Sequence, residues 1–269
     1  MRKIYLIVLF TFFVCTLSFA QKDSFELIRT YKGDIADAAI DNLDDLYIIS
    51  STGQIKKFTP SGDSIVYDQV KKYGKLYLLD ATNPLKLLLF YKDFSTIVVL
   101  DRFFATLQSI DLRKINILQP DAIGLSYDNN IWVFDEYDSK LKKIDDYGTL
   151  LSETTDFRTL FDLNVMPQKI INDNGFVYLA DTANGVFVFD NYGTFKKKMA
   201  LKNWQSIAIN NNIVITTNNE LVAFYNMSTF QQTQRRAPLF RPYFHSFTTP
   251  GRLVTFSNDT LNIYRHRFQ

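Results

Sequence analysis

The chain has 269 residues, of which 46% are hydrophobic and 15% are aromatic, and its single cysteine is Cys15. It carries 30 Lys and Arg against 28 Asp and Glu. Arg2 and Lys3 belong to a leader that we expect to be removed, so 28 basic residues remain against 28 acidic ones and the net charge is zero. A neutral chain gives no reason to expect nucleic acid or an anionic membrane as a partner. A mature chain without cysteine excludes disulfides, so its core must hold the fold together.

The first 20 residues have the pattern of a signal peptide. Arg2 and Lys3 form a basic start, residues 4–16 carry no charge, and Ser18-Phe19-Ala20 is a small-x-small cleavage site. The uncharged run is too short, and too close to that site, to favour a retained membrane anchor. We therefore expect residues 21–269 to be exported as one domain without a transmembrane anchor. The expected location is the periplasm or the outer membrane.

A two-strand signature recurs six times along the chain. Its first half is an apolar run, which starts at Leu46, Leu87, Ile131, Val177, Ile213 and Leu253. Its second half is an alternating strand, which starts at Ile55, Ile97, Leu141, Val186, Leu221 and Leu261. A period of roughly 40–45 residues with about four strands per unit is typical of propeller blades. The pattern predicts an all-β, six-bladed β-propeller with four-stranded antiparallel blades.

Near the N-terminus, an apolar strand at residues 25–31 precedes the first unit, whose innermost strand begins near Asp37. The second unit is the least regular. Residues 76–79 are predicted as its first strand and residues 80–84 as the turn that follows. Only residues 112–118 and 157–165 have patterns that favour a short helical turn or an extended loop.

The later units are easier to interpret. The fourth unit, residues 169–199, alternates apolar strands with turns rich in Asn, Asp and Gly, which tolerate positive φ. The last unit is one strand short, because the chain ends soon after residues 261–268. We therefore expect the N-terminal strand to complete the last blade. This closure removes two open strand edges that would otherwise favour aggregation.

The fourth unit also carries a family resemblance. Residues 177–190, VYLADTANGVFVFD, resemble the repeat of NHL-type six-bladed propellers, which read strand, Asp-Thr/Ser-x-Asn, strand, Asp-x-x-Gly. Residues 131–148 are a looser copy. The arginine that usually follows the asparagine is replaced here by Gly185. The resemblance implies the superfamily of TolB-like six-bladed propellers, in which the fold does not determine the function.

The sequence contains no catalytic signature. There is no Gly-x-Ser-x-Gly motif, and the mature part has only two histidines, His245 and His266, whereas a histidine metal site needs two or three converging ligands. We expect His245 to be packed and His266 to be solvated. Asp135, Asp181 and Asp190 each end a strand. Because their positions recur in successive blades, we expect them to bind turn amides and to take no part in acid–base chemistry.

A calcium-dependent lactonase, hydrolase or lyase with its site at the channel mouth is the alternative. Six-bladed lactonases hold calcium in the central channel, but their opening glutamate-containing motif has no counterpart here. The acidic stretch at residues 34–45 lacks the Asp-x-Asp-x-Asp-Gly spacing of a calcium loop. We therefore expect no cofactor and no enzymatic activity, and calcium remains the alternative.

One polar residue per unit falls where the chain enters the innermost strand, beside the expected channel. These channel-mouth candidates are Asp37, Lys75, Asp121, Gln168, Gln205 and Arg241. A polar ring at a channel mouth is a common ligand site. Simple solvation predicts polar residues there equally well, so both interpretations stay open.

Residues 231–269 contain six arginines, one acid and no lysine, with aromatic residues between them. Arginine and aromatic side chains are enriched at protein interfaces. The partner-binding candidates lie on the expected connection between the fifth and sixth blades: Arg235, Arg236, Phe240, Arg241 and Tyr243. The alternative is a solvated basic surface.

The composition, rich in Asn, Lys, Ile, Phe and Tyr, resembles that of the bacterial phylum that uses type IX secretion. Ser64, Thr182 and Thr260 follow aspartates in a pattern that resembles the O-glycosylation sequon of that phylum. The sequence thus favours a non-catalytic, protein-binding scaffold module of the cell envelope. Such a module would suit an accessory subunit of an outer-membrane or secretion assembly.

Overall fold

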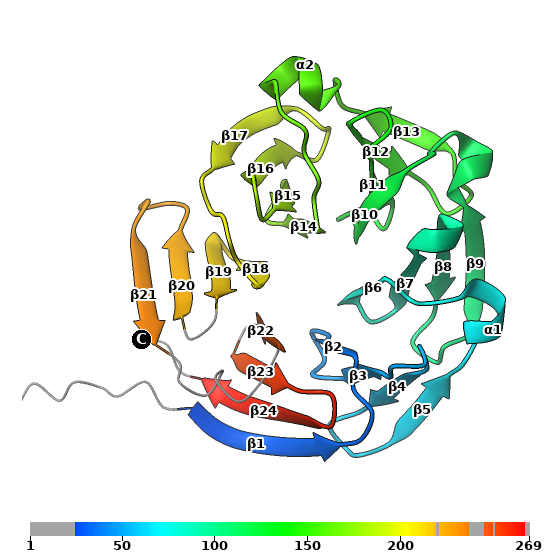
Figure 1. Cartoon of the computed structure of the whole chain (residues 1–269), viewed down its shortest axis with the longest axis vertical. Helices are drawn as coiled ribbons and strands as arrows, with labels where there is room; N and C mark the ends of the chain where they lie inside the picture. The colour runs from blue at the N-terminus through cyan, green and yellow to red at the C-terminus, as the bar shows by residue number, and fades with distance from the viewer. Residues whose placement is uncertain (1–24, 219–220, 237–244, 250, 267–269) are drawn as a thin grey trace, which may run out of the picture.

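The structure is a computed structural model that describes residues 25–218, 221–236, 245–249 and 251–266. Six four-stranded sheets are arranged as the blades of a ring (Figure 1). Within each sheet, every hydrogen-bonded pair of strands is antiparallel; β2 and β3 are one such pair. The predicted all-β, six-bladed propeller is therefore confirmed. In the described part of the chain, no helix has the length and apolar character needed to cross a membrane.

The blades are numbered in chain order, and each is given from its innermost strand outward. Blade 1 contains β2 (Asp37–Ile40), β3 (Leu46–Ile49), β4 (Ile55–Phe58) and β5 (Ser64–Tyr67). Blade 2 contains β6 (Leu78–Asn83), β7 (Lys86–Tyr91), β8 (Thr96–Leu100) and β9 (Thr106–Asp111). Blade 3 contains β10 (Pro120–Leu125), β11 (Ile131–Asp135), β12 (Lys140–Ile144) and β13 (Leu150–Glu153).

The second half of the ring repeats this arrangement. Blade 4 contains β14 (Lys169–Asp173), β15 (Phe176–Asp181), β16 (Gly185–Asp190) and β17 (Phe195–Met199). Blade 5 contains β18 (Ser206–Asn210), β19 (Ile213–Asn218), β20 (Leu221–Asn226) and β21 (Gln232–Arg236). Blade 6 contains β22 (His245–Thr249), β23 (Arg252–Phe256), β24 (Thr260–His266) and β1 (Phe25–Lys32).

The core lies between the blades, which explains why the second strands are apolar at consecutive positions. In β7, Leu87 and Leu89 pack in a cluster shared with blade 1, whereas Leu88 and Phe90 pack in a cluster shared with blade 3. Successive side chains of a strand point to opposite faces of the sheet, so a sheet covered on both faces needs apolar residues at every position.

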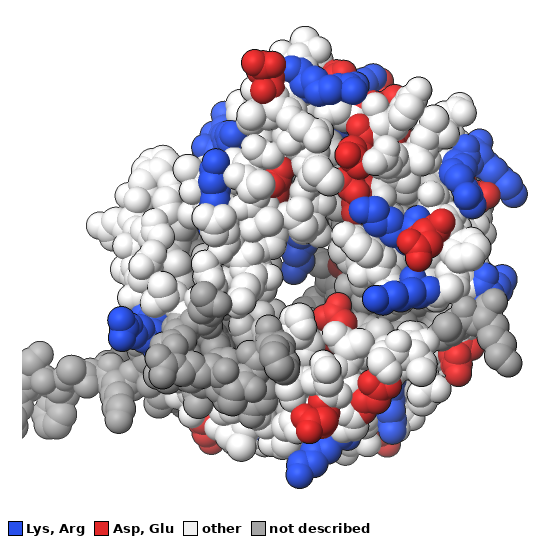
Figure 2. All heavy atoms as spheres, viewed as in Figure 1, with Lys and Arg blue, Asp and Glu red and all other residues white. Residues whose placement is uncertain are grey.

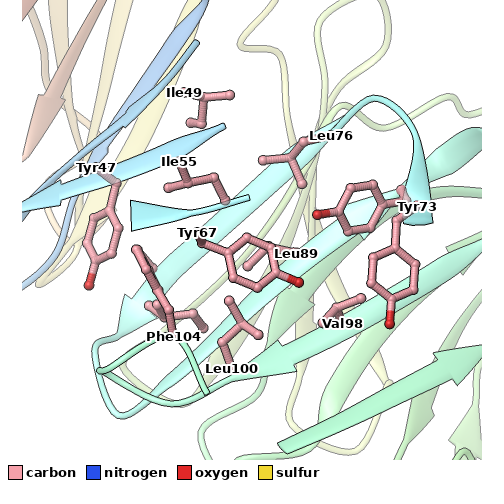
Figure 3. Packing of buried hydrophobic residues seen from close by; sticks show 13 residues of the cluster. Tyr47, Ile49, Ile55, Tyr67, Tyr73, Leu76, Leu89, Val98, Leu100 and Phe104 are labelled. Carbon is pink, nitrogen blue, oxygen red and sulfur yellow. The ribbon is translucent and has the colours of Figure 1, made fainter. Parts of the chain in front are cut away.

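Figure 3 shows the cluster between blades 1 and 2. Tyr47 and Ile55 from blade 1 meet Leu89 and Leu100 from blade 2, and the Phe104 ring packs among them. Each of these aliphatic side chains is fully buried, which contributes about 1.5–3 kcal/mol per side chain to folding before the entropy cost. The blades therefore stabilise one another, and no single sheet could fold alone.

The N-terminal strand closes the ring, as predicted. β1 pairs antiparallel with β24, from Phe25 opposite His266 to Lys32 opposite Thr260, with a bulge between Leu27 and Arg29. In Figure 1 the two strands lie side by side, with β1 as the outermost strand of the last blade. Strands from the start and the end of the described chain thus share the last blade, which closes the ring by backbone hydrogen bonds.

Three local expectations were wrong. β6 runs over Leu78–Asn83, so Asp80 lies inside this strand and not in a turn. Two short helices were not predicted: α1 (Val70–Tyr73) and the 3-10 helix η1 (Lys92–Phe94). The predicted helical segments contain η2 (Leu112–Ile115) and α2 (Phe157–Phe161), which confirms them.

The departure from the NHL-type pattern at Gly185 has a structural cause. Gly185 adopts φ of +104°, a conformation that L side chains rarely adopt. A Cβ atom at this position would also collide with the backbone carbonyl oxygen of Met199 on the neighbouring strand β17. An arginine here would therefore require the fourth blade to rearrange, which is why this blade carries glycine.

Candidate functional site

The blade topology gives the ring two different ends. In blades 1 to 5 the first and second strands, and the third and fourth strands, are joined by turns at the same end of the ring, because a meander reverses direction at each turn. Blade 6 has the same antiparallel strand directions, but its third and fourth strands, β24 and β1, are distant in the sequence. We call this end the turn face. The opposite end carries the turns between second and third strands and the connections between blades, and we call it the cavity face.

Aspartates hold the turns of the turn face in a fixed shape. Asp101 accepts hydrogen bonds from the backbone N–H of Phe103 at 2.8 Å and of Ala105 at 2.9 Å. Asp145 likewise accepts hydrogen bonds from the backbone N–H groups two and four residues later, those of Tyr147 at 2.9 Å and Thr149 at 2.8 Å. Such side-chain bonds to turn amides are the usual role of aspartate in tight turns.

The same turns present aromatic side chains to solvent. In the third-to-fourth-strand turns of blades 2 to 5, the exposed fractions are 66% for Phe103, 83% for Tyr147, 80% for Tyr192 and 67% for Phe230. We call these four residues the aromatic tips. Three first-to-second-strand turns add exposed apolar side chains on the same face: Leu43, Leu85 and Tyr127. Single exposed apolar residues need no explanation, but a repeated set on one face does.

Several charges on the turn face are paired. Lys143 Nζ lies 2.6 Å from Asp128 Oδ2, and Lys196 Nζ lies 2.9 Å from Asp190 Oδ2. Burial raises the pKa of Asp128, but hydrogen bonds from Lys143 and its other neighbours outweigh burial and lower the pKa to about 2. Lys86 pairs in the same way with Asp146 of the next blade. Each of these cations has its own carboxylate, whereas the exposed Arg102 lies over the Phe103 ring of its own turn.

The cavity face is hollowed. Figure 2 shows an opening at the centre of the ring, which we call the channel, with acidic and basic side chains around it. A cavity of about 450 Å³ is lined by residues from blades 1, 2 and 6, among them Ser50, Ser51, Asp37, Lys75, Tyr77 and His245. The His245 ring stacks on Phe256, with centroids 5.1 Å apart, but the side chain is exposed to the cavity, so the expectation of a packed histidine was wrong in part.

Charged groups of the channel are enclosed by protein. Burial raises the pKa of Asp37, although His245 and Lys169 act against this shift. Burial lowers the pKa of Lys169, which lies at the start of β14. Water still reaches both side chains through the channel, so these directions reflect enclosure by protein and not complete removal from solvent.

The six channel-mouth candidates do not form one ring of free side chains. Asp37 and Lys75 line the cavity. Asp121 is buried and paired with Lys92 of the neighbouring blade. The side-chain oxygen of Gln168 accepts a hydrogen bond from the Thr182 N–H at 2.8 Å. The Gln205 backbone N–H donates to Thr217 at 2.7 Å, and Arg241 lies outside the described residues.

The partner-binding candidates are placed differently from the prediction. Arg235 and Arg236 lie in β21, the outermost strand of blade 5, and not on a connection between blades. Arg235 is half-buried and Arg236 is exposed. Phe240, Arg241 and Tyr243 lie outside the described residues. The error arose because the arginine pair follows a polar run that resembles a loop but extends the sheet.

The glycosylation candidates differ in accessibility. Ser64 starts β5 and is exposed. Thr260 starts β24 and is half-buried. Thr182 is half-buried and its hydroxyl donates to the Trp204 carbonyl at 3.2 Å. Of the three, only Ser64 offers an exposed side chain for modification.

The aspartates that end strands have structural roles, as predicted. Asp181 Oδ1 accepts from the Ala183 N–H at 2.7 Å and the Asn184 N–H at 2.9 Å. Asp135 is fully buried and pairs with Lys142 at 2.7 Å. Among the described residues, no group of three or more His, Cys, Asp or Glu is arranged to hold a metal ion. These carboxylates therefore stabilise blades and turns.

Sequence reasoning missed the aromatic tips and Lys169. Asp101, Asp145 and Asp190 are each followed two residues later by an aromatic residue, and the intervals of 44 and 45 residues match the blade period. This Asp-x-aromatic repeat was visible in the sequence. Lys169 had no such signal, because its environment depends on strands brought together by the ring.

No protein-family model and no curated protein matches the chain. Several solved structures are similar in fold. The Pan2 WD40 domain of Neurospora crassa aligns with a TM-score of 0.63 at 12% identity, over 92% of this chain and 96% of that one. A protein of Bacteroides fragilis described as exported aligns with a TM-score of 0.61 at 10% identity, over 92% and 95%.

A catalytically inactive histidine variant of virginiamycin B lyase from Staphylococcus aureus, solved with quinupristin, is also similar. It aligns with a TM-score of 0.57 at 12% identity, over 90% of this chain and 89% of that one. At such low identity these likenesses show the fold alone. The structures that share this fold include a WD40 domain, a protein described as exported and a lyase.

Proposed function

We propose that this protein is a non-catalytic scaffold module that binds another protein through its turn face. The observation that carries this proposal is the set of aromatic tips, which lie in the same turn of four successive blades. Phe103, Tyr147 and Tyr192 also share one position, two residues after the aspartate of the turn. Hairpin turns do not need an aromatic residue at this position, since Gly, Asn, Asp and Ser serve turns best. The aromatic side chains therefore have a use other than folding.

The chemistry of the turn face suits a protein partner. Tyrosine and phenylalanine are enriched at the centres of protein interfaces, where they bury a large area at a small entropy cost. The aspartate bonds hold Phe103, Tyr147 and Tyr192 in place before binding, which reduces the ordering cost further. Because Lys86, Lys143 and Lys196 are paired with carboxylates, the face suits a largely uncharged protein surface better than an anionic polymer.

The proposed place of action is the cell envelope. The predicted signal peptide at residues 1–20 supports export, and the similar fold of a protein described as exported agrees with it. An accessory role in an outer-membrane or type IX-like secretion assembly is the finer form of this proposal. The NHL- and TolB-like relationship belongs to the same proposal, because it rests on the repeat in residues 177–190.

The test is a pull-down from the native envelope, with bound proteins quantified by mass spectrometry. We expect Tyr147→Ser with Tyr192→Ser to keep the melting temperature and to lose the partner. The matched control is Tyr137→Ser, because Tyr137 is 61% exposed but lies between β11 and β12 on the cavity face. Equal recovery of every partner by the double variant and the control would refute the proposal.

An enzyme with its site at the cavity is the second candidate, and the position of His245 favours it. His245 and Asp37 line the same cavity and interact electrostatically, and a histidine–carboxylate pair is a common acid–base unit. The test is turnover of lactone, ester and streptogramin substrates with and without calcium. Turnover that is lost in His245→Ala and unchanged in Tyr137→Ser would favour the enzyme over the scaffold.

A further inference from the structure

Lys169 is exposed to solvent, and its partners differ from those of the buried lysines of the molecule. Lys57, Lys142 and Lys143 each lie within 2.7 Å of a carboxylate oxygen. Among the described residues, Lys169 has no carboxylate within 4.0 Å, and its Nζ donates one hydrogen bond, to the Ile207 carbonyl at 3.2 Å. An ammonium group has three donors, so two remain for another acceptor.

The acids nearest to Lys169 do not serve as its partners. Asp80 and Asp37 act on Lys169 only through longer-range attraction. Both oxygens of Asp80 already accept backbone N–H groups, from Thr82 at 2.8 Å and from Leu125 at 2.7 Å. The Asp80 carboxylate therefore fixes the inner strands of blades 2 and 3 and is not free to turn toward Lys169.

Asp37 is the second polar group that can form further hydrogen bonds. Its Oδ1 accepts from the Ala38 N–H at 2.8 Å, and within the described part of the chain its Oδ2 has no hydrogen-bond partner. Asp37 lines the cavity and is coupled electrostatically to Lys169 and His245. The cavity thus presents an acceptor at the start of β2, and a cation with spare donors lies at the start of β14, another innermost strand of the ring.

We propose that the cavity and the channel bind a small carboxylate that also carries hydroxyl groups, with Lys169 holding the carboxylate and Asp37 accepting from a hydroxyl. A neutral ligand would leave the charge of the ammonium group uncompensated, and a purely anionic ligand would be repelled by Asp37. The cavity volume of about 450 Å³ lies within the usual range for small-molecule sites. Lys75 at the rim adds positive charge that attracts an anion.

This proposal is independent of partner binding at the turn face, because the two sites lie at opposite ends of the ring. Lys169 lies on β14 and Asp37 lies on β2, which are the innermost strands of different blades. Only a closed ring brings them together across the channel. The ligand would therefore bind the folded propeller and not any isolated blade.

The experiment is calorimetric titration of residues 21–269 with D-glucuronate, glycolate, D-glucose and inorganic phosphate. D-glucuronate and D-glucose share their hydroxyl groups but differ in the carboxylate. We expect D-glucuronate to bind and D-glucose not to bind. Lys169→Met should weaken D-glucuronate binding at least about tenfold, since methionine cannot donate the charged hydrogen bond to the carboxylate.

The matched control is Lys202→Met, because Lys202 is an exposed lysine in the connection between blades 4 and 5. It should bind D-glucuronate like the wild type. If Lys169→Met fails to fold, Asp37→Asn is the second variant and should also weaken binding. The proposal is overturned if neither D-glucuronate nor glycolate binds, if D-glucose or phosphate binds as tightly as D-glucuronate, or if both channel variants bind normally.

Discussion

The turn face and the cavity face are built from the same six blades but differ in how regular their surfaces are. The turn face is built from short hairpins that are alike in successive blades, so it carries a repeated feature, the aspartate-held aromatic tip. The cavity face is built from connections that differ between blades, and it carries features that occur once, such as His245 and the nearby Lys169. A repeated surface suits a broad contact with another protein, and a single asymmetric hollow suits a small ligand.

Deleting the strand that closes the ring tests whether the folding of both faces depends on closure. We expect this change to have the largest effect on stability. Deleting residues 21–32 removes all of β1 and exposes the β24 edge. We expect the melting temperature to fall by at least about 10 °C, because a loss of a few kcal/mol shifts a domain of this size by that much. Thermal melting followed by circular dichroism measures this. Deleting only residues 21–24 should have no effect, and a 21–32 deletion that melts like the wild type would contradict the closure account.

Removing the aspartate that holds one aromatic tip tests whether partner binding depends on the turn face and not on the cavity face. Asp145→Ala removes the acceptor for the Tyr147 and Thr149 amides, which should cost about 1–2 kcal/mol of folding free energy and weaken partner binding. Its control on the cavity face is Asp156→Ala, since Asp156 caps α2 by accepting from the Arg158 N–H at 2.8 Å. Urea unfolding and partner pull-down measure both effects. If the two variants lose the same partner equally, the tips have no special role.

A smaller effect comes from acid titration of the paired charges on the turn face. The pKa of Asp128 in the fold is about 2, below its ordinary value of 3.8, so the charged form is favoured by folding. Its stabilisation is therefore complete above about pH 4 and is lost as the pH falls toward 2. We expect a loss of about 1 kcal/mol, reduced by solvent screening because the side chain is 31% exposed.

Urea unfolding at pH 6 and at pH 3 measures this loss. Asp128→Asn should reduce the difference between the free energies of unfolding at pH 6 and pH 3, because the amide does not titrate in this range. An unchanged difference in that variant would show that other carboxylates cause the acid sensitivity.

The ring could be predicted because its cause is local. Alternate residues of a strand such as β7 face two neighbouring blades, so the sequence shows an unbroken apolar run every 40–45 residues or so. The closure of the ring could be predicted in the same way, because the last unit lacks a strand and the N-terminal segment contains a spare one. The errors lie where the local signal is weak. Asp80 resembles a turn residue in the sequence, but its carboxylate ties β6 to β10 through the Leu125 amide.

The candidate sites were less predictable for a physical reason. Asp37 and Lys75 were expected at the channel mouth, and both line the cavity. Asp121 has the same position in its blade but is neutralised by Lys92, a residue of the preceding blade that no local pattern connects with it. Lys169 shows the same limit, because the absence of an ion-pair partner among the described residues is a property of three-dimensional packing. The position of a residue in the repeat predicts the direction of its side chain, but it does not predict which side chains from other blades contact it.

Site-specific photo-crosslinking tests the central claim, that the turn face and not the cavity face contacts the partner protein. A photoreactive phenylalanine analogue would replace Tyr192 on the turn face or Tyr137 on the cavity face, both of which are exposed. After irradiation of native envelopes, we predict a discrete crosslinked species from position 192 and none from position 137. A crosslink from position 137 alone, or equal crosslinks from both positions, would contradict this account.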